Sequence, residues 1–202
     1  VLYVSGHGLL DQDYNFFFAT YNMDFSNPAK HGISYDLLEG ILDSIPARKK
    51  LLLMDACHSG EVDVEAMKGA EKDIFENDSN TIVKEMAFRG ANNTNRPKLG
   101  LQNSYELMQE LFVNLNRGSG AQVISAAAGN SYALESDKWK NGVFTYSILS
   151  GFENYAADLN GDKIITVSEL RAYVGEKVVE LTNGAQKPTS RQENVVNDFR
   201  VW

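Results

Sequence analysis

Two short apolar runs limit what this chain can fold into, because each is free of polar interruptions and leads into a small polar motif. Val1–Val4 leads into the motif SGHG at Ser5–Gly8, and Leu51–Met54 leads into the motif DACHSG at Asp55–Gly60. Such runs predict strands buried on both faces, which occur mainly in parallel sheets covered by helices. We therefore expect the two motifs at the carboxyl ends of neighbouring strands, where ligands bind in sheets of this kind.

Between and after these strands the chain alternates helix and strand patterns. Residues 34–45 carry apolar side chains at helical spacing, with Ser34 placed to cap the helix and Pro46 to end it. The other predicted helices are Tyr105–Leu115, Val143–Phe152 and Ser168–Leu181. The other predicted strands are Phe16–Thr20, Ala121–Ala127 and Val195–Trp202. This order predicts an α/β fold, a mostly parallel sheet with helices on both faces in three layers.

Length and composition exclude several classes of protein. The 202 residues suit a single domain, and their net charge of −8 disfavours a nucleic-acid partner, which needs a basic face. No apolar stretch approaches the roughly 18 residues of a membrane span, so no membrane partner is expected. The chain shows no signal-peptide pattern, and its single cysteine rules out an internal disulfide. These features predict a protein of a reducing compartment, the cytoplasm.

The two motifs contain the residues that a cysteine nucleophile needs. Cys57, the only cysteine, would attack as a thiolate, and His7 would take its proton and return it to the leaving amine. Each residue alone has an ordinary structural explanation, a buried thiol or a hydrogen-bonded imidazole. His58 adjoins the nucleophile but would point to the opposite side of an extended segment, and His31 is expected on a surface loop. His7 and Cys57 are therefore the predicted catalytic pair.

Glycines flank both members of this pair. At Gly8 the backbone N–H can approach the scissile carbonyl because no Cβ stands in the way, and with the N–H of Cys57 it would form an oxyanion hole. At Gly60 the chain can turn away without covering the sulfur. The sequence thus predicts backbone oxyanion donors at Gly8 and Cys57.

Asp55 is the predicted determinant of specificity. It precedes Cys57 by two residues, so in a strand it shares the face of the sulfur and would bind a cationic substrate side chain. Ser5, two residues before His7, would line the same pocket, and Ser125 would offer backbone hydrogen bonds to an extended substrate. Glu135 is a weaker candidate for a second acid. The structural alternative for Asp55 is a carboxylate that holds its own loop by accepting backbone N–H groups.

The two motifs together resemble the caspase-like cysteine peptidases. The His lies about fifty residues before the Cys, as in that family, and Asp55 before the Ala with His58 and Ser59 after the Cys resembles its bacterial, metacaspase-like branch. Ser125 and residues 141–145 (NGVFT) resemble the family's small-subunit half. The resemblance implies an endopeptidase that cleaves after Arg or Lys through a thioester acyl-enzyme. It also implies that the first strands of the family fold are missing from this chain.

On this resemblance the chain is one peptidase domain in three parts. Residues 1–60 form a large-subunit-like part with the His/Cys pair, residues 61–102 a polar linker or insertion, and residues 103–202 a small-subunit-like part. The linker contains basic residues at which the enzyme would process itself, namely Lys72, Lys84, Arg89 and Lys98. A plain solvated insertion is the alternative. The implied partner is a peptide or protein with a basic residue before the scissile bond. The resemblance also allows a fused sensor or partner domain, of which this sequence shows no sign.

A second motif, at residues 158–169, resembles a calcium-binding loop. Its oxygen-bearing residues fall at loop positions one, three, five, nine and twelve: Asp158, Asn160, Asp162, Thr166 and Glu169. Lys163 stands where that motif has glycine, and its charge opposes cation binding. In the alternative, Thr166 and Glu169 form a capping box for the next helix. The peptidase chemistry itself needs no cofactor, so Ca²⁺ would act as an activator.

Two other functions stay open at this point. The chain could be a catalytically silent caspase-like module that binds or regulates a partner. It could also be an interaction domain that responds to calcium through residues 158–169.

Overall fold

The computed structural model describes residues 1–11, 13, 15–24, 26–58, 120–126, 134–136, 139–190 and 198–202, with the backbone alone at seven of them: Leu9, Leu10, Cys57, His58, Glu135, Ser136 and Ser190. The predicted helix at Tyr105–Leu115 and the polar segment 61–102 lie outside the described residues. Within the described residues no helix is both long enough and apolar enough to cross a membrane.

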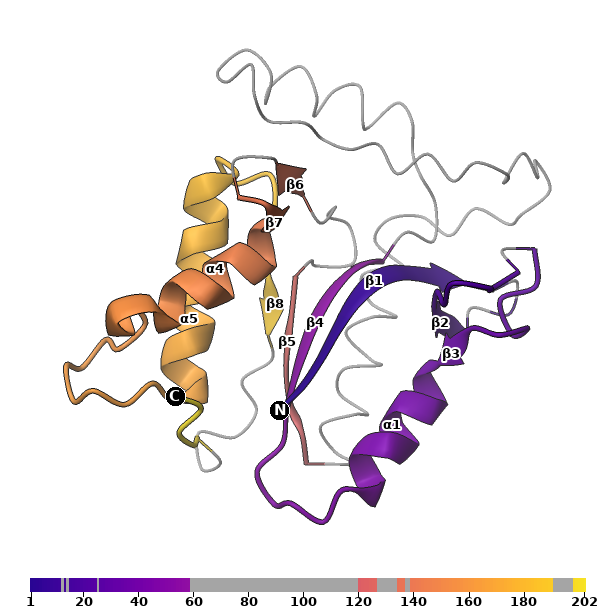
Figure 1. Ribbon diagram of the computed structural model, residues 1–202, viewed down its shortest axis with the longest axis horizontal. Helices are drawn as coiled ribbons and strands as arrows, with labels where there is room; N and C mark the ends of the chain where they lie inside the picture. The colour runs from indigo at the N-terminus through magenta and orange to yellow at the C-terminus, as the bar shows by residue number, and fades with distance from the viewer. Residues whose placement is uncertain are drawn as a thin grey trace.

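Six of the described strands form one sheet, in the order β3-β2-β1-β4-β5-β8 (Figure 1). Its centre is parallel: β1 (Leu2–Leu10), β4 (Leu51–His58) and β5 (Gln122–Ser125) run in the same direction. The outer strands are short and antiparallel to their neighbours: β2 (Phe16–Phe18), β3 (Ile33–Ser34) and β8 (Thr189–Ser190). A separate hairpin joins β6 (Glu135–Ser136) to β7 (Asn141–Gly142).

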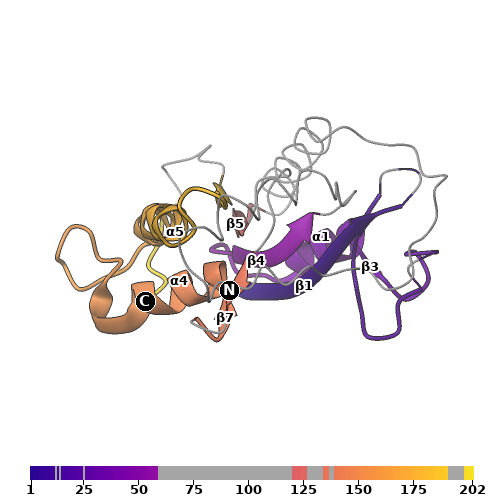
Figure 2. The ribbon, with the colours of Figure 1, turned by 90° about the horizontal axis from the view of Figure 1, so that it is seen from above.

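Alternating residues of β4 separate the two faces of this sheet. Leu52 and Met54 pack in a cluster with helix α1 (Tyr35–Ser44), whereas Leu51 and Leu53 pack in a cluster with α4 (Val143–Phe152) and α5 (Val167–Leu181). In Figure 1, α1 lies toward the β1–β3 side of the sheet and α4 and α5 toward β5 and β8; Figure 2 gives the view from above. The predicted α/β/α fold is therefore confirmed.

The helix boundaries follow their capping residues. The Ser34 hydroxyl accepts a hydrogen bond from the Leu37 N–H and begins α1, and the helix stops at Ser44, just before Pro46. A full capping box begins α5: the Glu169 N–H donates to Thr166 Oγ1, and the Thr166 N–H donates to Glu169 Oε2. A short 3₁₀ helix, η1 (Glu153–Tyr155), follows α4.

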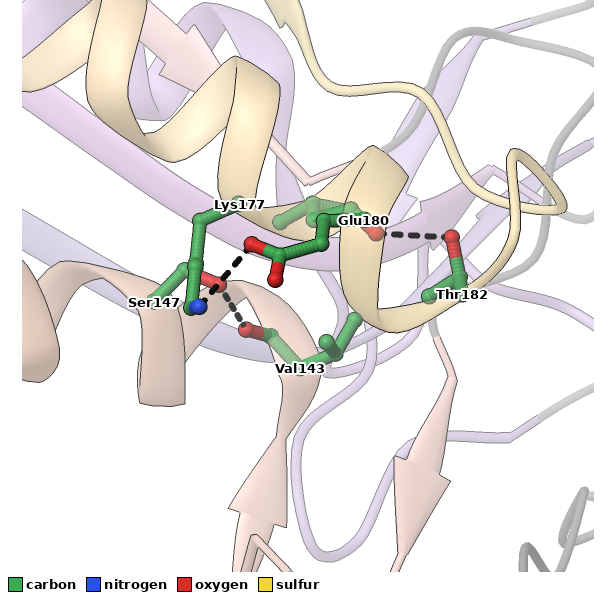
Figure 3. Close-up of polar contacts among 6 residues, drawn as sticks. Val143, Ser147, Lys177, Glu180 and Thr182 are labelled. Atoms are coloured by element: carbon green, nitrogen blue, oxygen red, sulfur yellow. Dashed lines mark hydrogen bonds and ion pairs between the residues drawn. The ribbon is translucent and has the colours of Figure 1, made fainter. Parts of the chain in front are cut away.

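Helices α4 and α5 pack against each other over a core of fully buried side chains that includes Phe144 and Leu170. Polar contacts at their ends are local (Figure 3). The Ser147 hydroxyl donates to Val143 O over 2.7 Å, the Thr182 hydroxyl donates to Val178 O over 2.7 Å, and Lys177 pairs with Glu180 at 2.9 Å. The first two bonds give buried hydroxyls a partner on a backbone carbonyl one turn earlier in the same helix.

Strand β1 and the carboxyl-terminal segment differ most clearly from their sequence patterns. β1 continues to Leu10, well beyond the apolar run Val1–Val4, because its last residues pair with β4 on one side and with β2 on the other. His7 therefore lies inside a strand and not after it. At the carboxyl terminus, the described residues 198–202 form no strand, but their backbone is hydrogen-bonded to Ile165 and Val167 around an isolated bridge from Thr166 to Arg200.

Candidate active site

The backbone places His7 and Cys57 side by side. The two are register partners in the parallel β1–β4 pair, two residues beyond the pair Ser5–Asp55. Neighbouring strands lie about 4.8 Å apart, and residues paired across them share one face of the sheet. The His7 carbonyl accepts the Ala19 N–H at 2.8 Å, which holds this part of β1 to the start of the loop after β2. His7 is half-buried, so its ring is neither sealed in the core nor wholly in solvent.

The glycines of the SGHG motif have different roles in the backbone. Gly6 has φ +155°, a conformation that L side chains rarely adopt, so glycine is needed there for β1 to continue through the motif. Gly8 is buried and lies between two strands, paired with His58 of β4 and with Phe18 of β2. Gly60 lies outside the described residues. The oxyanion role expected for Gly8 and Cys57 stays a prediction.

Asp55 lies in β4 with only 7% of its surface exposed, and it is held by the helix that covers its own face of the sheet. The Thr145 hydroxyl, from the first turn of α4, donates to Asp55 Oδ2, and the Tyr3 hydroxyl lies 2.6 Å from Thr145 Oγ1. An ionised carboxylate only accepts hydrogen bonds, so Thr145 donates its single proton to Asp55 and must accept from Tyr3. A directed chain Tyr3–Thr145–Asp55 results. The carboxylate is thus bound to a helix and not, in this contact, to backbone N–H groups of its own loop.

The backbone of Gly142 also lies close to Asp55. A Cβ built at Gly142 would come within 2.9 Å of Asp55 Oδ2, a distance that real Cβ atoms essentially never show. Gly142 is the N-cap of α4, has no side chain to cap it, and no acidic residue follows in the first turn. The carboxylate of Asp55 therefore supplies the negative charge that the N-terminus of a helix favours.

Not every predicted site residue joins this cluster. Ser5 is exposed beside Asp55 in register, whereas Ser125 is fully buried and pairs with Met54, which packs on the α1 face. Ser125 also pairs with Thr189 of β8 on its other edge. The alternation of β5 thus puts Ser125 on the face opposite Asp55. Glu135 lies in β6, which pairs with β7 next to Gly142.

A fully buried glutamine, which no sequence pattern singled out, fixes the backbone after β5. Gln186 Nε2 donates to Ala126 O at 2.8 Å, and its Oε1 accepts the Leu134 N–H at 2.7 Å. Its own N–H donates to the Thr182 hydroxyl at 3.1 Å. Every polar group of this side chain has a strong partner, as a buried amide requires. The amide fixes the residue that follows Ser125.

The loop at residues 158–164 uses its oxygens on its own backbone. Asp158 accepts the N–H groups of Gly161, Asp162 and Lys163, and Asn160 and Asp162 each accept the N–H two residues ahead. Lys163 has φ +63°, in the left-handed region that glycine prefers. Within the part of the chain that the structure describes, no group of three or more His, Cys, Asp or Glu side chains is placed to hold a metal ion. A calcium ion at Asp158, Asn160, Asp162 and Glu169 stays a prediction.

The carboxyl end of the chain secures the same loop and α5. Asp198 accepts the Ser168 N–H at 3.0 Å and also the Ser168 hydroxyl. Burial works against ionisation of Asp198, but these hydrogen bonds outweigh it and hold the pKa of the carboxyl below its usual value. Burial lowers the pKa of the nearby Arg171 guanidinium, while Asp198 opposes that shift.

Comparison with protein families gives one match. The family model for the caspase domain matches residues 1–200, nearly the whole chain. No curated protein and no solved structure shows a significant match.

Proposed function

We propose, from the premise that this chain belongs to the caspase-domain family, that it is a cysteine endopeptidase cleaving after Arg or Lys. The family consists in general of cysteine peptidases. The finer assignment, to its bacterial metacaspase-like branch, rests on Asp55 before the Ala and on His58 and Ser59 after the Cys.

One observation carries the proposal: the register pairing of His7 with Cys57 at the carboxyl side of the parallel strands. In the proposed reaction His7 removes the proton from Cys57 Sγ, and the thiolate attacks the carbonyl carbon of the scissile bond. The carbonyl electrons move onto oxygen, where the N–H groups of Gly8 and Cys57 would stabilise the negative charge.

The intermediate then collapses and the C–N bond breaks. The imidazolium of His7 gives its proton to the leaving amine, which leaves the acyl group on sulfur as a thioester. Water, deprotonated by His7, attacks the thioester, and the bond to sulfur breaks to release a carboxylic acid and the free thiol. No metal takes part in these steps.

Asp55 is the proposed binding site for the substrate's basic side chain, with Ser5 beside it. A carboxylate on the same face as His7 favours a guanidinium or an ammonium group and repels an acidic one. Ser125 is the proposed source of backbone hydrogen bonds to the substrate. It directly precedes Ala126, whose carbonyl accepts the Gln186 side-chain amide.

Self-cleavage within residues 61–102 completes the proposal. The segment contains Arg89 followed by Gly90, a basic site without a following proline. If the enzyme processes itself, wild-type chains should be cut after a basic residue of this segment and Cys57→Ala chains should stay intact. Identical fragments from both, together with full activity of the uncut chain, would contradict self-processing.

The test of the main activity is cleavage of fluorogenic peptides that end in Arg, Lys or Asp, with Cys57→Ala and His7→Ala as controls. We expect cleavage after Arg and Lys that both variants abolish. Cleavage only after Asp would keep the catalytic pair but reject Asp55 as the pocket acid. An unreactive Cys57 and no cleavage of any peptide would favour the silent binding module.

A further inference from the structure

We infer that Thr145 is a positioning residue that makes the pocket prefer Arg over Lys, by fixing the orientation of the Asp55 carboxylate. This inference rests on the proposed function, because it concerns the side chain that Asp55 receives. The inference adds to the proposed substrate-binding site a residue of helix α4 that lies far along the chain from both sequence motifs.

The contact is direct and spans the fold. The Thr145 hydroxyl donates to Asp55 Oδ2, and the two residues are 90 positions apart in the chain. Behind Thr145, the Tyr3 hydroxyl from β1 donates to Thr145 Oγ1 at 2.6 Å. One side chain of α4 therefore connects the carboxylate of Asp55 on β4 to Tyr3 on β1.

The chain of bonds restricts rotation of the carboxylate. Thr145 is β-branched and lies in the first turn of α4, so its χ1 has few choices. At Gly142, the N-cap of the same helix, an added Cβ would stand 2.9 Å from Oδ2, so the space between this backbone and the carboxylate has no room for a side chain. The bond from Thr145 thus limits how far the Asp55 carboxylate can turn, and the backbone at the start of α4 leaves little free space beside the same oxygen.

A fixed plane matters more for Arg than for Lys. A guanidinium is a planar fork that pairs with a carboxylate through parallel N–H bonds, and this geometry is lost when the carboxylate turns. An ammonium is a compact charge with three rotatable donors, and it tolerates such a turn. Release of Asp55 from Thr145 should therefore weaken Arg recognition more than Lys recognition.

The experiment compares Thr145→Val, which keeps the shape but removes the hydroxyl, with Thr145→Ser, which keeps the hydroxyl. For Thr145→Val we expect kcat/KM on Arg peptides to fall about tenfold, as for loss of a hydrogen bond to a charged group, mostly through KM. On Lys peptides we expect a fall of threefold or less, so the Arg-to-Lys ratio drops. Thr145→Ser should restore most of that ratio.

Ser147→Ala is the matched control on the same helix. Its hydroxyl is buried and bonds only to Val143 O in the contacts described, so its loss perturbs α4 without touching Asp55 (Figure 3). This variant should leave the Arg-to-Lys ratio unchanged even if it lowers Tm. An unchanged ratio in Thr145→Val, or an equal change in Ser147→Ala, would overturn the inference.

A second readout does not require turnover. Binding of Arg and Lys peptides to Cys57→Ala chains, with and without Thr145→Val, is measured by calorimetry. A preference for Arg that disappears with Thr145→Val supports the inference even if the wild type cleaves nothing, in which case only the proposed peptidase activity fails. Binding without an Arg preference, or no binding of either peptide, overturns the inference.

Discussion

The two faces of strand β4 differ in how they end. On the α1 face its side chains are apolar to the end, and Leu52, Met54 and Ala56 are all fully buried. On the α4 face Leu51 and Leu53 are followed by Asp55, a buried carboxylate held by Thr145. One strand thus supports packing on one side and chemistry on the other, and residues of the same type should respond differently to mutation on the two faces.

The largest expected effect is on stability, from truncating leucines of β4. Leu52→Ala and Leu53→Ala should each lower the free energy of unfolding by about 2–5 kcal/mol, because both side chains are buried and leave a cavity. Urea unfolding measures both. Only Leu53 lies beside Tyr3 in register, so only its variant should also change the Arg-to-Lys ratio. A changed ratio in Leu52→Ala would remove the distinction between the faces.

Two glycines, one on each face of the sheet, should respond in opposite directions to substitution by alanine. At Gly142 an added Cβ meets Asp55, so Gly142→Ala should lower the free energy of unfolding by about 1–3 kcal/mol and weaken Arg binding. At Gly40, inside α1, a Cβ meets nothing within 4 Å, so Gly40→Ala should raise that free energy by about 0.5–1 kcal/mol. Thermal unfolding of the pair checks both signs, and a stabilising Gly142→Ala would be evidence against the close contact.

Removing the N-caps of α5 and α1, one on each face of the sheet, should change the free energy of unfolding by less than the glycine substitutions. Thr166→Ala removes a complete capping box from α5 and should lower the free energy of unfolding by about 1–2 kcal/mol. Ser34→Ala removes a single bond from α1 and should lower it by about 0.5–1 kcal/mol. Denaturant midpoints at constant m-value separate the two, and equal losses would argue that the reciprocal Glu169 bond adds nothing.

A smaller, pH-dependent effect belongs to the α5 side. The pKa of Asp198 is lower in the folded chain than in the unfolded one, where it is about 3.9. Its contribution to stability is therefore complete above the unfolded pKa and is lost as the pH falls through the lower folded pKa. The stability difference between wild type and Asp198→Asn, from unfolding curves at pH 3–7, should be constant near neutrality and shrink in acid. A difference that grows in acid would contradict this sign.

Calcium gives the smallest expected effect. The carboxylates of residues 158–169 already accept backbone N–H groups and Lys163 adds positive charge, so binding is expected only in the weak range of about 10⁻⁴–10⁻³ M. Millimolar calcium should then raise Tm slightly through mass action. Asp162→Asn should abolish the rise. No rise in the wild type would leave the loop with its capping role alone.

The sequence was most informative where structure is local. Ser34, Pro46 and Thr166 mark helix ends through short-range bonds and restricted dihedrals, and α4 covers the predicted Val143–Phe152. Helical spacing was less informative about burial. The pattern in α1 marked Leu37 and Ile41 as apolar face residues, yet they are 53% and 42% exposed, because the helix covers the sheet with Leu38 and Leu42.

The site was predictable only in part, because some of its contacts join residues far apart in the chain. Pairing of the two motifs followed from the rule that parallel strands present their carboxyl ends together, and the β1–β4 register agrees with it. The bond from Thr145 to Asp55 joins residues that are 90 positions apart in the chain, and no sequence pattern predicts which residue the hydroxyl of a helical threonine will bind. The role of Gln186 could not be predicted from the sequence either, because it depends on two backbone groups whose positions are set by tertiary structure.

The Gln186 amide links the end of β5 to the start of α4. It donates to Ala126 O and accepts the Leu134 N–H, and Leu134 O in turn accepts the Val143 N–H in the first turn of α4. Loss of the amide, as in Gln186→Ala, would leave a C=O and a buried N–H without these partners. The helix that carries Thr145 would then lose this link to the sheet, so a side chain outside both motifs helps to keep α4 in place over Asp55.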